Sequence, residues 1–146
     1  MKKFALIGAA VLNIIAAIAC CVASFVYLGK DMFFIMLAEV MLYGIGIGFL
    51  HYFYRKKLDI STKTFRMSLY IPTGAAAVLF SLIMFVRMLN VGSGMILGRE
   101  AAGYFLRMVI VLAATTIFLL IVWGMEAAVI GIMNSRSKQK NEEKEE

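Results

Sequence analysis

Proline, histidine and cysteine are scarce in this sequence, and the shortage excludes several kinds of site. In 146 residues there is one proline, Pro72, one histidine, His51, and a single pair of cysteines, Cys20 and Cys21. A catalytic Ser/His/Asp set or a zinc site needs several side chains that converge, and this chain has no such cluster of candidates. The sequence therefore predicts no catalytic residues, no metal site and no cofactor.

Charge is also scarce over long stretches. Hydrophobic residues make up 62% of the chain and the mean hydropathy is +0.88, whereas soluble domains are about half apolar. Uncharged runs cover 4–29, 32–38, 40–54, 67–86 and 108–125. None of them alternates between apolar and polar residues as a membrane β-strand does. We therefore predict an all-α integral membrane protein.

Four membrane-spanning helices account for these runs, because a helix needs roughly 18 apolar residues to cross ~30 Å of hydrocarbon. We predict spans at 4–28, 32–54, 67–89 and 104–130, which form a four-helix bundle within 1–133. The second span joins two short runs across Glu39, since neither run alone is long enough to cross. The polar, charged residues 134–146 are predicted to be a disordered tail or a fraying extension of the last helix.

The basic residues predict the orientation. Eleven of the fifteen fall at the N-terminus, in the loop between the second and third spans and in the tail: Lys2, Lys3, Arg55, Lys56, Lys57, Lys63, Arg66, Arg136, Lys138, Lys140 and Lys144. Short loops rich in Lys and Arg stay cytoplasmic, so both termini of this multi-pass cell-membrane protein are predicted to be cytoplasmic. The basic loop Arg55–Arg66 is expected to attract anionic headgroups. Nucleic acid is not expected as a partner, because the positive charge lies beside helix ends.

The adjacent cysteines in IAAIACCVASF, residues 15–25, allow three interpretations. A lipoprotein cleavage site would follow a basic start and an apolar run, but the sequence after Cys20 stays apolar. A redox or metal pair would need further ligands nearby. Helix packing fits the neighbours, because Ala16, Cys20 and Ser24 are spaced four apart and form a ridge of small residues. We predict that the pair serves packing.

Glycines point to further close helix contacts. Gly44 and Gly48 form a GxxxG step on the second span, which permits close approach of another helix. Gly74 contributes a similar small-residue surface on the third span.

Glu39 is the charge that the second span must carry into the membrane. A carboxylate there is expected to be paired, neutral or in contact with water. Arg107 and Arg87 are candidates for a structural ion pair with it, although both could instead reach outward to headgroups. A proton- or ion-coupling role for Glu39 is the third alternative. Nearer the inner surface, His51 and Glu126 lie at the same predicted depth and are a second candidate pair.

The segment GIGIGFLHYFYRKKLDISTKTFRM, residues 44–67, resembles part of the uncharacterised small four-helix membrane proteins of Gram-positive bacteria, which are often encoded beside LytTR-type transcription regulators. This resemblance implies a regulatory or sensing partner and supplies no catalytic residues. We predict a non-catalytic accessory protein that packs against a membrane or cytoplasmic partner, with homo-oligomerisation an open alternative. The competing hypothesis is a small proton- or cation-coupled transporter or channel-like oligomer that uses Glu39.

Overall fold

The computed structural model describes residues 2–26, 30–91 and 97–142, which form four α-helices and one short turn. The helices are α1 (Lys2–Val26), α2 (Lys30–Leu58), α3 (Thr62–Val91) and α4 (Leu97–Glu142). The prediction of an all-α chain with four helices is confirmed. Each helix contains a stretch that is long and apolar enough to cross a membrane.

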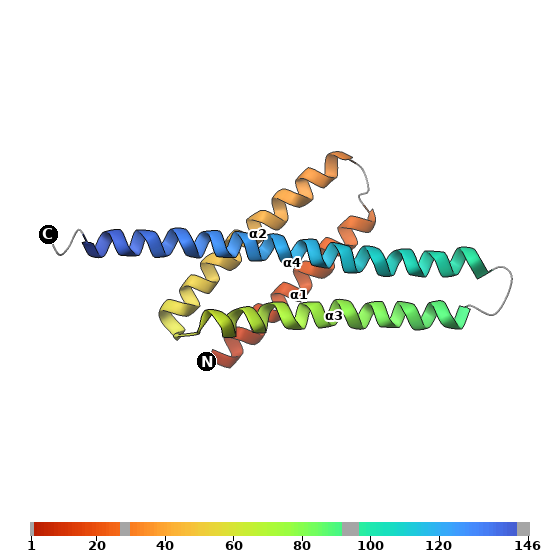
Figure 1. Ribbon diagram of the computed structural model, residues 1–146, viewed down its shortest axis with the longest axis horizontal. Helices are drawn as coiled ribbons and strands as arrows, with labels where there is room; N and C mark the ends of the chain where they lie inside the picture. Colours follow the sequence, from red (N-terminus) through yellow and green to blue (C-terminus); the bar gives the residue numbers. More distant parts are fainter. Residues whose placement is uncertain (1, 27–29, 92–96, 143–146) are drawn as a thin grey trace.

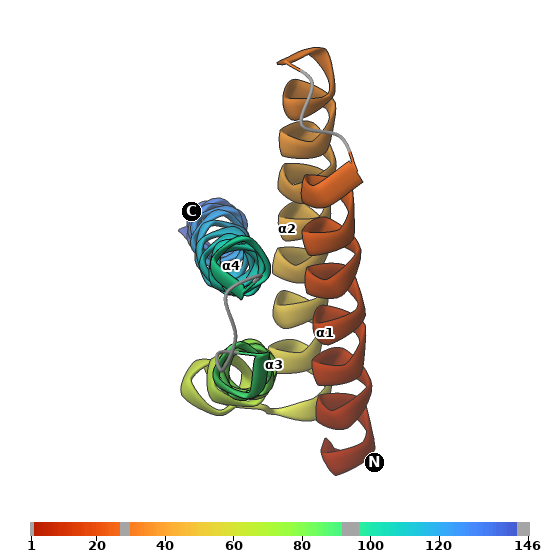
Figure 2. The same cartoon turned by 90° about the vertical axis from the view of Figure 1, so that its right-hand side faces the viewer.

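The helices form two antiparallel pairs that cross each other obliquely. One pair is α1 with α2 and the other is α3 with α4, as the two views in Figures 1 and 2 show. Helix α4 lies at the crossing and makes its most extensive contacts with α2 and α3. Helix α1 packs mainly on α3 and touches α2 little, although the two are consecutive in the chain. Contacts between the pairs therefore hold α1 and α2 in place.

Several chain ends gather at one end of the bundle. The start of α1, the turn between α2 and α3, and the C-terminal end of α4 lie toward the left in Figure 1. The other ends of the four helices lie toward the right. Lys2 Nζ donates a hydrogen bond of 3.4 Å to the Asp59 carbonyl, which ties the start of α1 to this turn.

The turn between α2 and α3 is much shorter than the loop predicted at Arg55–Arg66. Only residues 59–61 lie outside the helices, so most of that segment is helical. Asp59 has a φ of 48°, a left-handed conformation that short polar side chains tolerate at helix ends. Ser61 Oγ then accepts a hydrogen bond of 3.2 Å from the Thr64 N–H and caps α3. As a result, Arg66 lies in the second turn of a helix and not in a loop.

Helix α4 is longer than the fourth span predicted from the sequence. It has 46 residues, which corresponds to a length of about 69 Å at 1.5 Å per residue. Residues 134–142 of the predicted tail continue this helix, and residues 143–146 lie outside the part of the chain that the structure describes. The segment contains no proline or glycine, and five of its nine residues are Lys, Arg, Gln or Glu, which are good helix formers.

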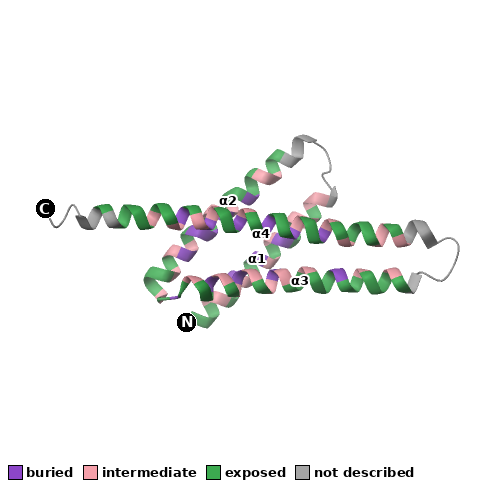
Figure 3. Cartoon of the chain, in the orientation of Figure 1, coloured by how far each residue is buried: buried purple, intermediate pink, exposed green. Residues whose placement is uncertain are grey.

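Burial is confined to one stripe on each helix, which appears purple in Figure 3. On α4 the buried positions recur every three or four residues, as Val111, Thr115, Phe118, Val122, Glu126 and Val129. The outward faces carry large apolar side chains such as Phe4 and Leu42, which are 82% and 68% exposed. Exposed apolar surface on this scale promotes aggregation in water and is suited to a lipid environment.

Candidate functional site

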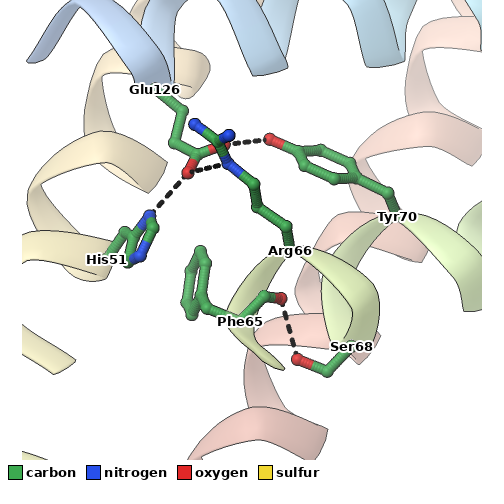
Figure 4. Close-up of polar contacts among 6 residues, drawn as sticks. All are labelled: His51, Phe65, Arg66, Ser68, Tyr70 and Glu126. Carbon is green, nitrogen blue, oxygen red and sulfur yellow. Dashed lines mark hydrogen bonds and ion pairs between the residues drawn. The ribbon is translucent and has the colours of Figure 1, made fainter. Parts of the chain in front are cut away.

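Glu126 of α4 is the centre of a buried polar cluster (Figure 4), which we define as His51, Arg66, Tyr70 and Glu126. The Glu126 side chain is fully buried, and its Oε1 accepts hydrogen bonds from His51 Nδ1 at 2.5 Å and from Arg66 Nε at 3.0 Å. Its Oε2 accepts a hydrogen bond of 2.6 Å from the Tyr70 hydroxyl. His51 comes from α2, and both Arg66 and Tyr70 come from α3. One carboxylate therefore joins three helices.

The helical repeat brings these donors to the same place. Arg66 and Tyr70 are four residues apart and so lie on one face of α3. Next to them, Phe65 and Leu69 are fully buried and hold this part of α3 in the core. On α2, His51 lies four residues after the buried Ile47 and points into the same interior.

The His51 ring is held by stacking as well as by its hydrogen bond. Its centroid lies 4.3 Å from that of Phe65, with 15° between the ring planes. A carboxylate oxygen only accepts hydrogen bonds, so the proton of this contact belongs to His51 Nδ1. The other ring nitrogen, Nε2, is buried and has no hydrogen-bond partner among the residues that the structure describes.

Arg66 gives the cluster its positive charge. Its side chain is 31% exposed, and its guanidinium carbon lies 5.8 Å from the centre of the Trp123 ring. A buried carboxylate without a partner is costly in a protein interior and in a membrane. Here the guanidinium balances the charge of Glu126, while His51 and Tyr70 donate two further hydrogen bonds to the carboxylate. The arrangement is suited to fastening helices together. Within 2–26, 30–91 and 97–142, no group of three or more His, Cys, Asp or Glu could hold a metal ion.

A second polar group lies where α1 crosses α3. The Asn13 side chain is fully buried, and its Nδ2 donates to Thr73 Oγ1 at 2.9 Å and to the Leu69 carbonyl at 3.3 Å. The Tyr43 hydroxyl of α2 donates to Asn13 Oδ1 at 3.2 Å. All hydrogen-bonding atoms of the Asn13 amide group thus contribute to joining α1, α2 and α3.

The structure does not form the ion pair predicted for Glu39 with Arg107 or Arg87. All three side chains are exposed, and the ion pairs among the described residues involve other acids. The Arg107 guanidinium instead lies 5.8 Å from the centre of the Tyr104 ring.

The register of the helices explains this difference. A Cβ at Gly44 would meet Val122 and Met125, and α2 and α4 run in the same direction. Glu39 is therefore level with about residue 117 of α4, roughly ten residues or 15 Å along the axis from Arg107. Arg87 is out of reach because α3 barely contacts α2.

The predicted packing residues divide between inner and outer surfaces. A Cβ added to Gly44 would lie 2.8 Å from Met125 Cβ, and one added to Gly48 would lie 2.7 Å from Val129 Cβ. This GxxxG step is therefore occupied by α4 of the same chain and is not free for a partner. A Cβ at Gly74 would meet nothing within 4 Å, so Gly74 does not mark a close contact within the chain.

On α1, the predicted ridge does face other helices. Ala16 and Cys20 pack against the hydrophobic core. Ser24 Oγ donates to the Cys20 carbonyl at 2.8 Å and approaches Met36 Sδ of α2 at 3.6 Å. Both cysteines are free thiols, and Cys21 Sγ lies 3.6 Å from Thr115 Oγ1 of α4.

Sequence reasoning identified His51 and Glu126 as neighbours but missed Arg66, Tyr70, Thr73 and Tyr43. Arg66 was assigned to a loop, where it would have had no fixed direction. The signal that was available is the i, i+4 spacing of Arg66 and Tyr70, which places a cation and a phenol on one helix face. Comparison of the chain with protein-family models, with curated proteins and with solved structures finds no match.

Proposed function

We propose that this chain is a multi-pass membrane protein with both termini on the cytoplasmic side. The support is the combination of four helices of spanning length with large apolar side chains on their outward faces. Exposed bases also gather at the end of the bundle that holds the N-terminus and the α2–α3 turn: Lys2, Lys3, Arg55, Lys56, Lys57 and Lys63. Each base near an anionic surface contributes about 1 kcal/mol of attraction.

We further propose that the protein is a non-catalytic accessory subunit that binds a partner membrane protein through its outward helix faces. The observation that carries this proposal is the closed polar interior around Glu126. Its carboxylate is fully buried and engaged by three side chains. These hydrogen bonds fix the shape of the bundle and leave the Glu126 carboxylate itself unavailable to a substrate. What remains available for recognition is the apolar outer surface and the basic end.

The alternative of transport coupled to Glu39 has less support. Glu39 is exposed on the outside of α2, and it does not line the cavity of about 380 Å³ between α1, α3 and α4. A coupling residue is expected to face a bundle interior or a water-filled cavity.

Topology and flux assays test these proposals separately. Reporter fusions after Lys57 and after Ser135 should read cytoplasmic, and a fusion after Ser93 should read external. A cytoplasmic signal after Ser93 would contradict the four-span topology. Purified protein in liposomes should leave proton and cation leakage at the level of protein-free vesicles. Leakage that Glu39→Gln abolishes would favour the transporter.

Cross-linking tests the accessory role. A photoreactive amino acid placed at exposed positions, one at a time, should capture the same partner polypeptide from one helix face in native membranes. Positions on the opposite face of the same helix are the matched controls. Equal capture from every face, or capture of lipid alone, would contradict a specific partner surface.

A further inference from the structure

A cavity of about 380 Å³ lies between α1, α3 and α4. It begins where α1 crosses α3, at the hydrogen bonds from Asn13 to Thr73 and Leu69. Beyond this crossing the two helices diverge toward the ends of α1 and α3 (Figure 1). Three of the positions that line the widening gap carry alanines, namely Ala17 on α1 with Ala76 and Ala77 on α3. Larger side chains would be needed to close the gap, so the cavity stays open.

The cavity opens sideways and is apolar. Its lining includes Ile18, Val22 and Phe80, which are also exposed on the outer surface of the bundle. The polar lining groups are already in contact within the protein: Cys21 Sγ lies 3.6 Å from Thr115 Oγ1, and Thr73 Oγ1 donates to the Leu69 carbonyl at 3.0 Å. The lining is therefore suited to an apolar occupant, because it offers no free hydrogen-bonding group to a polar one.

We propose that an acyl chain of a bilayer phospholipid enters this cavity from the side. The inference rests on the proposed membrane insertion of the chain. Ala77 lies fifteen residues into α3, or about 22 Å from the start of that helix. At this depth in a membrane the surrounding medium is hydrocarbon, since the hydrocarbon core is ~30 Å thick. A lipid chain is therefore the apolar group that is present at the opening.

Size favours the same occupant. A water molecule takes up about 30 Å³ in the liquid and a methylene group is of similar size, so the cavity holds about a dozen methylene groups. A helix of a second copy, about 10–12 Å wide with its side chains, is too thick to enter. Leaving an apolar cavity of this size empty is destabilising, and much smaller apolar cavities take up benzene.

Retention of phospholipid by the purified protein tests this proposal. The full chain is reconstituted in vesicles of phosphatidylcholine and phosphatidylglycerol, extracted into mild detergent and examined by native mass spectrometry. The wild type should retain one phospholipid per chain. Ala77→Leu, which fills the cavity, should lower the retained fraction about tenfold. Ala75→Leu is the matched control, because Ala75 is exposed and does not line the cavity.

Thermal stability separates a filled cavity from a misfolded variant. Complete removal of lipid should lower the melting temperature of the wild type and of Ala75→Leu, but not that of Ala77→Leu. A phosphatidylcholine with a diazirine near the methyl end of its acyl chain should label Val111, a cavity residue that is buried from the outer surface, in the wild type but not in Ala77→Leu.

The outcomes that would overturn the proposal are distinct from failure of the proposed membrane location. If the protein floats with vesicles but retains lipid equally in the wild type and Ala77→Leu, the cavity is not the lipid site. If a dimer that Ala77→Leu disrupts appears in place of bound lipid, the face is an interface between copies. If the protein does not float with vesicles, membrane insertion fails and the lipid site with it.

Discussion

Removing the carboxylate of Glu126 should be the most destabilising single change in the polar cluster. Glu126→Ala deletes the acceptor of three hydrogen bonds at once and leaves His51 buried without a partner for Nδ1. Breaking a buried ion pair by removing one partner costs 3–5 kcal/mol as an order of magnitude. Because the Arg66 side chain is 31% exposed and can turn toward water, we expect a loss near the lower end, about 3 kcal/mol.

Glu126→Gln removes the charge of this side chain while nearly keeping its shape, so it measures the contribution of the charge. The amide keeps one oxygen that accepts a hydrogen bond, but it places an NH₂ group against a donor and removes the charge that balances Arg66. One lost hydrogen bond to a charged group corresponds to about 1.5–3 kcal/mol. Polar contacts measured inside membranes average only about 0.6 kcal/mol. Between these two values, we expect Glu126→Gln to lower the free energy of unfolding by about 1–2 kcal/mol, clearly less than Glu126→Ala.

The assay is reversible unfolding in mixed detergent micelles, followed by circular dichroism, with the free energy of unfolding compared between variants. Glu39→Ala is the matched control, because Glu39 is exposed and its side chain forms no ion pair with Arg87 or Arg107. This control should unfold like the wild type. A Glu126→Ala protein within about 0.5 kcal/mol of the wild type would refute the assignment of a fastening role, since changes of that size are typical of uninvolved surface positions.

Two further predictions test the packing and the second polar group. Gly48→Ala should destabilise the protein by about 1–3 kcal/mol in the same unfolding assay, because a Cβ there would lie 2.7 Å from Val129 Cβ. Gly46→Ala, with open space around the added Cβ, should be stabilising by up to about 1 kcal/mol; equal effects at the two glycines would contradict the observed register of α2 on α4. Asn13→Ala should cost about 1–2 kcal/mol through its lost hydrogen bonds. Tyr43→Phe should destabilise the Asn13→Ala protein little further. If the losses in free energy of unfolding of the two single variants were fully additive in the double variant, the Tyr43–Asn13 contact would contribute nothing.

Composition and run length were sufficient to predict the helices themselves. Uncharged runs of spanning length and a single proline leave the backbone no alternative to helices if its polar groups are to be satisfied in lipid. The boundaries were less accurate. The charged residues Arg55–Arg66 suggested a loop, but Lys and Arg are good helix formers, and only the left-handed Asp59 and the Ser61 cap interrupt the helices.

The candidate site could be predicted only in part, because it depends on how the helices rotate and cross, which the sequence of a single span does not contain. The depth of His51 and Glu126 along their helices follows from residue counting, and it predicted their proximity. The rotation and crossing of the helices do not follow from counting, and they decide which faces meet. The register of α2 on α4 separates Glu39 from Arg107, and the packing of α3 on α4 brings Arg66 and Tyr70 to the Glu126 carboxylate.

The sequence by itself determined that this protein is a set of four long apolar helices, because each span's hydrogen bonds and hydrophobicity are local properties. Only the tertiary structure decided that Gly44 and Gly48 are used within the chain, that Glu126 is shared by three helices, and that alanines leave a cavity beside α1. The physical reason is that helices in lipid gain little from hydrophobic exclusion. Their arrangement therefore depends on close steric fit and on a few polar contacts between residues far apart in the chain.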